Sequence, residues 1–133
     1  MRTVRVSAAV IHDGSLIWAA RRARGKAAGQ WEFPGGKREK GESGEETVIR
    51  EIREELDSDI SVEKFLFTIS CGYPDFFLVM DCFLCRLEGG SLTLKEHDAA
   101  RWLRPDELDD IDWMPADALA VRRLKETMAW QQE

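Results

Sequence analysis

The sequence predicts an α+β domain that consists mostly of strands, with one helix in the middle and a second helix at the end. Runs rich in β-branched residues and bounded by turn residues predict the strands. Apolar residues change to helical spacing in Glu45–Leu56 and Ala116–Trp130, which predicts the two helices. With 133 residues the chain has the usual size of one domain, so we expect a single domain over residues 1–133.

The first third of the chain predicts two strands, a loop and a short extended segment. The first strand is rich in valine and isoleucine and ends at Asp13-Gly14, a strong signal for a hairpin turn. Pro34-Gly35-Gly36 cannot continue a strand comfortably, so we expect the extended segment to stop there. The expected elements are the strands Val4–Ile11 and Leu16–Ala20, the loop Arg21–Gln30 and the extended segment Trp31–Phe33.

After the central helix, strand-like runs alternate with turn residues again. Gly72-Tyr73-Pro74-Asp75 and Gly89-Gly90 predict two turns. Pro105 stands at an early helical position, where proline is permitted, so we expect a short helix over Arg104–Leu108. The expected strands of this part are Ser61–Ser70, Phe76–Leu87, Ser91–Leu94 and Ala100–Leu103.

Charge and hydropathy exclude several classes of function. The 25 acidic and 19 basic residues give a net charge of −6, which disfavours binding to a nucleic acid polymer. A phosphorylated small molecule is compatible with this charge, because metal ions reverse the local sign. No apolar run approaches the roughly 20 residues that span a bilayer, and no signal core precedes the first strand. We therefore expect a cytoplasmic protein that contacts no membrane.

The three cysteines do not predict a zinc site. Cys82 and Cys85 have C-x-x-C spacing, but no second pair or nearby histidine completes a set of ligands. Both lie in a predicted strand, where residues three apart face opposite sides of the sheet. We expect Cys71, Cys82 and Cys85 to be reduced, buried and structural.

Three glutamates, Glu51, Glu54 and Glu55, fall on one face of the predicted central helix, at spacings i, i+3 and i+4. The apolar positions Ile52 and Leu56 lie elsewhere around the same axis and anchor the helix to the core. Carboxylates this close raise one another's pKa, and a divalent cation removes that conflict. Mg²⁺, with Mn²⁺ as a substitute, suits such oxygen ligands. A merely solvated acidic face is the alternative interpretation.

These glutamates stand inside a motif of fixed spacing that resembles the Nudix box: Gly, five residues, Glu, seven residues, Arg-Glu, an aliphatic residue, any residue and Glu-Glu. Two later positions of the motif depart from the family pattern. Asp57 replaces a glycine, and aspartate tolerates a left-handed helix cap. Ser58 replaces an aliphatic residue, whose contact Ile60 supplies in part. The matching residues are Gly36, Glu42, Arg50, Glu51, Ile52, Glu54 and Glu55.

The resemblance extends to the MutT-like branch of the family over nearly the whole chain. It implies the Nudix α/β/α sandwich, in which a mixed β-sheet lies between the box helix and a C-terminal helix. It also implies Mg²⁺-dependent hydrolysis of a nucleoside triphosphate to a monophosphate and pyrophosphate, by a monomer or homodimer. The segments that carry it outside the box are Ala20–Ala23, Trp31–Gly36, Tyr73–Asp75, Lys95–His97, Trp102 and Pro115–Asp117.

The same resemblance assigns roles at the reaction centre. Either Glu51 or Glu96 acts as the general base, and an exposed loop acid is the alternative interpretation of Glu96. Glu42 and Arg50 correspond to a pair that braces the loop against the box helix. The residues that correspond to metal ligands are Gly36, through its carbonyl, and Glu51, Glu54, Glu55 and Glu96.

Three further residues correspond to the family's nucleotide-binding positions: Arg22, Phe33 and Asp117. Their alternatives are a surface arginine, a core phenylalanine and a first-turn acid of the last helix. An ionised Asp117 only accepts hydrogen bonds, which favours cytosine or 8-oxoguanine over uracil. We therefore expect CTP, dCTP or 8-oxo-dGTP as the substrate.

Two other functions stay open. A proline about as far past the box as Pro74 also marks hydrolases of ADP-ribose within the family, so an ADP-ribose or nucleotide-sugar pyrophosphatase is one alternative. A non-catalytic Nudix domain that senses a nucleotide is the alternative from a different class. Such domains typically lose box glutamates, and none is missing from this sequence.

Overall fold

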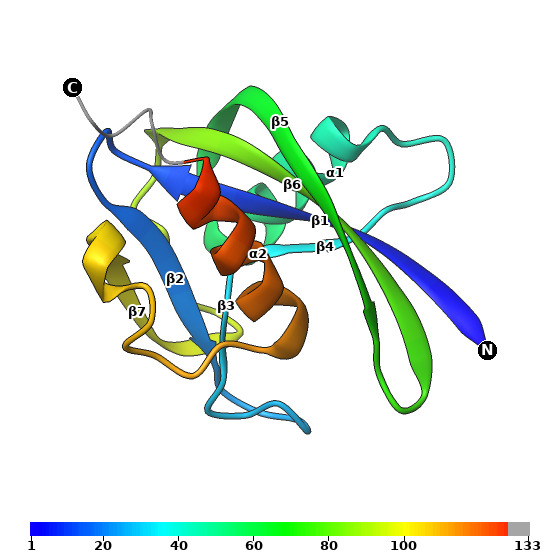
Figure 1. Ribbon diagram of the computed structural model, residues 1–133. Coiled ribbons are helices and arrows are strands. Elements are labelled where there is room, and N and C mark those ends of the chain that lie inside the picture. Colours follow the sequence, from blue (N-terminus) through cyan, green and yellow to red (C-terminus); the bar gives the residue numbers. More distant parts are fainter. Residues whose placement is uncertain (128–133) are drawn as a thin grey trace.

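The computed structural model describes residues 1–127, which form an α+β arrangement (Figure 1). None of the helices in this range is long and apolar enough to cross a membrane. The strands are β1 Arg2–His12, β2 Ile17–Arg22, β3 Trp31–Glu32, β4 Gly35–Lys37, β5 Asp59–Gly72, β6 Phe76–Gly89 and β7 His97–Leu103. The helices are α1 Gly44–Leu56 and α2 Pro115–Glu126, with one 3₁₀ turn, η1, at Pro105–Glu107.

The described strands form one mixed sheet. Its main order is β3-β2-β1-β6-β5, while β4 pairs with β1 and β7 pairs with β2. β1 and β6 run parallel along their lengths, from Arg2 opposite Phe76 to His12 opposite Arg86. The other pairs are antiparallel. A parallel pair at the centre of a sheet is stable when both faces are covered.

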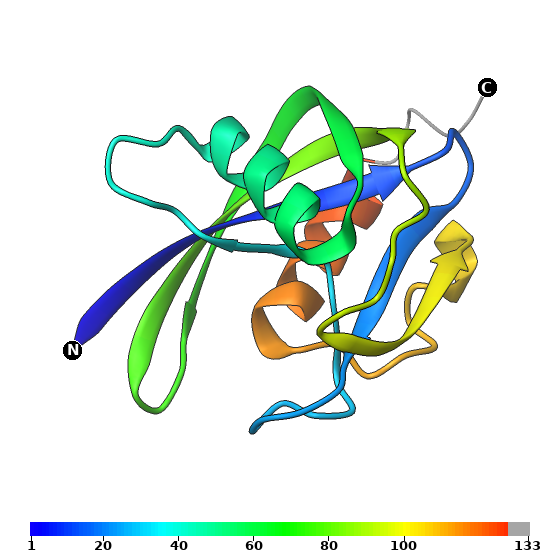
Figure 2. The same ribbon diagram turned by 180° about the vertical axis from the view of Figure 1, so that it is seen from behind.

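The two helices provide that cover, one on each face of the sheet. α2 lies in front of the sheet in Figure 1, and α1 lies in front of it in Figure 2, which shows the opposite side. Successive residues of β1 point to the two layers: Val10 packs in the cluster that contains Leu124 of α2, and Ile11 in the cluster that contains Ile52 of α1. The predicted α/β/α sandwich with a mixed sheet is confirmed.

Helix α1 forms where the apolar spacing predicts it. Val48, Ile52 and Leu56 are fully buried, and each such side chain contributes about 1.5–3 kcal/mol relative to exposure. The N-terminus carries a capping box, in which the Ser43 hydroxyl accepts from Glu46 N–H and the Glu46 carboxylate accepts from Ser43 N–H. The cap fixes where the acidic helix starts.

The C-terminus of α1 accommodates both departures from the family motif. Asp57 is left-handed, with φ 49° and ψ 42°, which confirms that aspartate replaces the expected glycine there. The buried Ser58 hydroxyl donates to the Leu56 carbonyl at 2.9 Å and accepts from Leu92 N–H at 2.8 Å. Ile60 is buried in the apolar cluster beneath α1. Hydrogen bonds therefore replace the aliphatic contact at Ser58.

Residues Gly35–Lys37 form the strand β4, although the sequence predicts that extended structure stops at these glycines. Gly35 pairs with Ala8 and Gly36 with Ser7 of β1. A Cβ atom at Gly35 would overlap the Ser7 carbonyl and lie 2.9 Å from the Ala8 Cα. Glycine thus permits a close backbone approach that a larger residue would prevent.

The prediction of a strand over Ser91–Leu94 is wrong. This segment instead binds the end of α1: Thr93 N–H donates to the Leu56 carbonyl at 2.9 Å. Just after it, Lys95 Nζ donates to the Asp57 carboxylate at 2.8 Å. Pairing with the end of a helix satisfies the backbone without a neighbouring strand.

The last predicted elements differ at their ends. The helix predicted over Arg104–Leu108 is the single 3₁₀ turn Pro105–Glu107. The helix predicted over Ala116–Trp130 begins at Pro115 and ends at Glu126, and residues 128–130 lie outside the described part of the chain.

The cysteines lie mostly where the strand pattern predicts. Cys82 and Cys85 are buried on opposite faces of the sheet, and burial raises the pKa of both thiols, that of Cys85 to about 12. Cys71 is only half-buried, so the prediction of burial is wrong for it. All three are free thiols.

Candidate active site

A cavity of about 680 Å³ opens beside the first half of β1 and the start of β6. Its walls come from α1 and β4, the loop between β2 and β3, the tip of the β5–β6 hairpin, and the N-terminus of α2. One part of the wall is acidic, and another part is mostly apolar and aromatic. The acidic part includes Glu32, Glu51, Glu55 and Glu96, and the apolar part includes Phe33, Tyr73, Phe76, Leu78, Met80 and Met114.

Helix α1 directs two of its three predicted metal-binding glutamates into this cavity. Glu51 and Glu55 line it, and the Glu51 side chain is only 15% exposed. Glu54 does not line the cavity, and its side chain is 57% exposed. The structure therefore brings Glu51 and Glu55 together and leaves Glu54 at the side.

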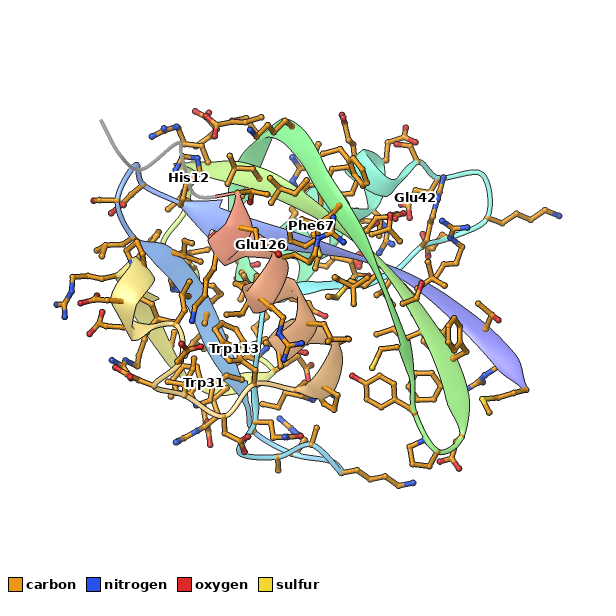
Figure 3. The ribbon with its side chains drawn as sticks, in the orientation of Figure 1. His12, Trp31, Glu42, Phe67, Trp113 and Glu126 are labelled. Carbon is orange, nitrogen blue, oxygen red and sulfur yellow. The ribbon has the colours of Figure 1, made fainter. Side chains whose placement is uncertain are left out.

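The position of Glu54 follows from Arg50. The Arg50 guanidinium donates from Nη1 to Glu51 at 2.7 Å and to Glu54 at 3.1 Å. On its other side it contacts Glu42, which lies on the loop before α1 (Figure 3). Arg50 Nη2 also donates to the Lys37 carbonyl at 3.1 Å. The arginine thus joins this loop, the end of β4 and the acidic face of α1.

The hydrogen bonds of this network favour the ionised forms of both Glu42 and Arg50. Glu42 accepts from Arg50, from Glu39 N–H and from the Thr47 hydroxyl, and these bonds lower its pKa to about 2. The Arg50 pKa is raised, first through the hydrogen bond to Glu42 and then by Glu51. The pair stays ionised across the physiological range.

Gly36 lies directly against the Glu51 carboxyl group. A Cβ atom at this position would overlap the Glu51 side chain. The absence of a side chain at Gly36 lets a carboxylate and a backbone segment meet at one point of the cavity wall. This contact is consistent with the predicted participation of Gly36 in a metal site.

Glu55 carries the clearest electrostatic signal in the acidic part. Burial, which is the largest cause, and the neighbouring carboxylates of Glu51, Glu32 and Glu96 together raise its pKa to about 8. Carboxylates that crowd in a partly dry wall resist ionisation. A bound divalent cation would relieve this repulsion, so the donor set fits such an ion.

The predicted metal ligands are nevertheless not assembled into a complete set. Within residues 1–127, no three histidine, cysteine, aspartate or glutamate side chains are arranged to hold a metal ion. Arg50 occupies oxygens of both Glu51 and Glu54. Oxygen ligands of the kind that Mg²⁺ and Mn²⁺ prefer are present, and they are held partly by this arginine.

Arg22 lines the cavity from the end of β2, where the pairing with β7 is irregular. Its Nη1 donates to Glu32 at 3.3 Å, and the other oxygen of Glu32 lies 2.9 Å from His97 Nε2. Glu32 and His97 also line the cavity, and His97 is buried. Glu32 therefore holds two basic side chains together in the cavity wall.

Asp117 lies in the first turn of α2 and is buried, only 5% exposed. Its Oδ1 accepts from Phe33 N–H at 2.9 Å. Burial raises the Asp117 pKa to about 8, although the Phe33 bond opposes that shift. At pH 7 this carboxyl group is therefore mostly neutral, whereas the sequence argument treats it as ionised.

Phe33 is buried in the core and also lines the cavity, so the core interpretation is confirmed and a role in nucleotide binding stays a prediction. Its ring lies 4.7 Å from the Trp113 ring, centre to centre. Trp113 lies beside Trp31, with which it forms an isolated bridge (Figure 3). The segment before α2 is thus joined to β3, which places Asp117 next to Phe33.

Glu96 enters the wall from the loop before β7. It is exposed, and its carbonyl accepts from Ala23 N–H at 3.3 Å. This contact joins the loop that carries Glu96 to the end of β2. Glu96 lies near enough to contribute to the raised pKa of Glu55.

Comparison with known proteins agrees with this geometry. The family model described as the NUDIX domain matches residues 1–131. The chain belongs to the Nudix family. A protein of Escherichia coli (strain K12) named "CTP pyrophosphohydrolase" is 33% identical over 118 residues, which are 88% of this chain and 87% of that protein.

Two other proteins are similar over most of their length. A "Putative 8-oxo-dGTP diphosphatase 2" from Mycobacterium tuberculosis is 28% identical over 96% of this chain and 92% of its own. The solution structure of the E. coli ORF135 protein superposes with a TM-score of 0.83 at 30% identity, over 97% of this chain and 93% of that one. Nudix hydrolases generally use divalent metal ions, which agrees with the acidic wall of this Nudix domain.

Sequence reasoning missed three residues that line the cavity of this Nudix hydrolase. Glu32 stands inside Trp31–Gly36, a segment that carries the resemblance, and its acidic side chain in an otherwise apolar segment was a usable signal. His97 ends Lys95–His97, another segment that carries the resemblance, and it is buried against Glu32. Tyr73 was interpreted as a turn residue only.

Proposed function

We propose that this Nudix hydrolase cleaves a nucleoside triphosphate into a monophosphate and pyrophosphate with Mg²⁺. The observation that supports this is a single cavity that joins the carboxylates of Glu51 and Glu55 to a buried wall at Phe33 and Asp117. The acidic part suits phosphates that arrive with metal ions, and the aromatic part suits a base. We place the reaction on free nucleotides in the cytoplasm, carried out by a monomer or homodimer.

Binding of Mg²⁺ depends on how α1 presents its acids. Glu54 would join the set only after it leaves Arg50, to which it is bonded at 3.1 Å. When bound, Mg²⁺ supplies neutralisation of phosphate charge and a water of lowered pKa. The groups that would hold it are the Gly36 carbonyl and the carboxylates of Glu51, Glu54, Glu55 and Glu96.

The general base is Glu51 or Glu96. Glu51 is fixed by Arg50 at 2.7 Å and therefore has one preferred orientation. Glu96 is exposed on a loop and free to turn toward a water. Separate Glu51→Gln and Glu96→Gln variants distinguish them: the base is the residue whose variant loses the acidic limb of the kcat–pH profile.

Arg22 and Lys37 supply positive charge to the phosphates. Both line the cavity, and Glu32 fixes the direction of the Arg22 guanidinium. A guanidinium fork matches two phosphate oxygens. Arg22→Ala should raise the KM for the nucleotide more than it lowers kcat, because uniform binding is removed.

Asp117 reads the base, and its protonation decides how. As a neutral acid below about pH 8 it donates one hydrogen bond, which cytosine N3 and guanine O6 can accept. Above that pH the carboxylate only accepts, and cytosine N4 or the N7–H of 8-oxoguanine fits while uracil does not. The names of the relatives, CTP pyrophosphohydrolase and 8-oxo-dGTP diphosphatase, support these two bases.

A nucleotide panel tests the proposal. Purified protein is assayed with CTP, dCTP, UTP, dTTP, dGTP and 8-oxo-dGTP, and phosphate is measured with and without added pyrophosphatase. We expect phosphate to appear only with pyrophosphatase, because the direct product is pyrophosphate. We expect CTP, dCTP or 8-oxo-dGTP to lead, and the ratio of CTP to UTP turnover to rise between pH 7 and pH 9.

Matched variants make the assay specific. Glu55→Gln changes a cavity acid, and Glu45→Gln changes an exposed acid of the same helix that does not line the cavity. Only Glu55→Gln should lower turnover strongly, by about 100-fold or more. Phosphate released without pyrophosphatase, or UTP as the best substrate at every pH, would contradict the proposal.

A further inference from the structure

Helix α2 begins without a capping side chain of its own. Met114 occupies the N-cap position and makes no side-chain hydrogen bond, and Pro115 has no N–H group. The next N–H group, that of Ala116, is donated to the hydroxyl oxygen of Tyr73 at 3.1 Å. A residue from a distant part of the chain therefore caps the helix that carries Asp117.

The capping hydroxyl lies at the tip of the β5–β6 hairpin, where Tyr73 contacts Phe76 through both its backbone and its ring. Tyr73 N–H donates to the Phe76 carbonyl at 2.8 Å. The two rings stack with their centres 4.9 Å apart and their planes 5° apart. Both rings line the cavity, so the hairpin turn fixes the phenol between the cavity and α2.

The capped residue, Ala116, directly precedes Asp117. Asp117 accepts from Phe33 N–H at 2.9 Å on one side, and its helix is fixed by Tyr73 on the other. Among the described residues, these are the two side-chain hydrogen bonds that connect the first turn of α2 to other parts of the cavity wall. Loss of either one would let this turn shift by the few tenths of an ångström that matter to a hydrogen bond.

We propose that Tyr73 is a positioning residue for base selection, which fixes Asp117 in the cavity through the N-terminus of α2. The inference rests on the proposed function for its effect on nucleotides, and on geometry alone for its effect on the helix. The hairpin that carries Tyr73 is a separate element from both the Nudix helix and α2. Selection of the base by this chain therefore depends on a hairpin outside the Nudix motif.

The test compares Tyr73→Phe, which keeps the stacked ring and removes the hydroxyl, with Thr127→Val. Thr127 also has a hydroxyl hydrogen bond at a terminus of α2: it donates to the Leu124 carbonyl at 3.1 Å, at the opposite end of the helix. Amide hydrogen exchange is followed by NMR for Ala116 and Phe33, and kcat and KM are measured for CTP and UTP. The first measurement requires no knowledge of the substrate.

In Tyr73→Phe we expect exchange at both amides to rise about fivefold, the scale of one net hydrogen bond. The KM for CTP should rise by a similar factor with kcat nearly unchanged, and the preference for CTP over UTP should shrink. Thr127→Val should change none of these. Unchanged exchange at both amides overturns the positioning role.

The two proposals fail in different ways. If the wild-type protein selects among nucleotides and Tyr73→Phe leaves the CTP preference unchanged, the role of Tyr73 in selection is wrong and the proposed function stands. If the wild-type protein hydrolyses no nucleoside triphosphate, the proposed function is wrong. The exchange data then still decide whether Tyr73 fixes the first turn of α2.

Discussion

Arg50 binds both carboxylate oxygens of Glu42, through Nε at 2.6 Å and Nη2 at 3.0 Å. The remaining nitrogen of the fork, Nη1, reaches Glu51. A planar guanidinium can serve both carboxylates at once, because its donors have fixed directions. One side chain thus sets the loop before α1 and the orientation of a cavity acid.

We expect Arg50→Lys to lower kcat/KM for CTP by about tenfold or more, because an ammonium group cannot reproduce the fork. Arg53→Lys is the matched control. Arg53 lies on the same helix, but it pairs with the exposed Asp59 of β5. Steady-state kinetics at saturating Mg²⁺ check the result. Equal activity of the two variants would show that the fork has no role.

The last two glutamates of the motif, Glu54 and Glu55, should differ in importance. Glu55→Gln removes an acid of the cavity wall and should lower kcat by about 100-fold or more, the scale on which metal-assisted catalysis is lost. Glu54→Gln changes an exposed acid and should cost about tenfold less. Mg²⁺ titrations of each variant measure the effect, and a larger loss in Glu54→Gln would reverse the assignment.

Gly35 and Gly36 should respond differently to the same change. Gly35→Ala meets the Ser7 and Ala8 backbone, which cannot move easily, so we expect a large fall in melting temperature. Gly36→Ala meets the Glu51 side chain, which can rotate away, so the fold should survive while hydrolysis falls. Thermal denaturation and turnover of both variants separate the outcomes. Full activity in Gly36→Ala would show that hydrolysis does not depend on the close contact between Gly36 and Glu51.

The Asp117 pKa of about 8 predicts a specific pH dependence of stability. The carboxyl group binds its proton more tightly in the folded state than in the unfolded chain, whose value is near 3.8. Its contribution is therefore complete below about pH 4 and is lost as pH rises through 8. We expect the wild-type melting temperature to fall more between pH 5 and pH 9 than that of Asp117→Asn. Parallel curves for the two proteins would contradict the burial of a neutral acid.

Metal removal provides a direct check of the acidic wall. Excess EDTA should abolish turnover, and Mg²⁺ or Mn²⁺ should restore it. Ca²⁺ should bind and support little turnover, because its longer and looser coordination places a water poorly. Full activity in EDTA would exclude the proposed chemistry.

The elements that sequence could predict are those with a strong period or a fixed motif. The spacing of Val48, Ile52 and Leu56 predicts α1, and the left-handed conformation of Asp57 follows from the local preference of aspartate. The strand β4 could not be predicted in the same way, because its formation depends on how closely β1 approaches Gly35. Propensity describes a residue and its neighbours along the chain, and this contact is not local.

The same distinction between local signals and non-local contacts applies to the candidate site. The motif predicts which acids belong together, but not that Arg50 would draw Glu54 to the side of α1. It identifies Asp117, but burial against Phe33 decides its charge. The sequence marks Glu32 as an unusual acid, but its contacts with Arg22 and His97 form only where β2, β3 and β7 lie side by side.

Lys95 connects the end of α1 to the loop that carries Glu96. It donates to the Glu54 carbonyl at 3.1 Å and to the Asp57 carboxylate at 2.8 Å, so the last turn of α1 is tied to the residue just before Glu96. The backbone of the loop that carries Glu96 is therefore tied to the end of α1. In the proposed metal site, the side chains of Glu54 and Glu96 would still have to turn toward the ion, whereas the backbone that carries them is already in place.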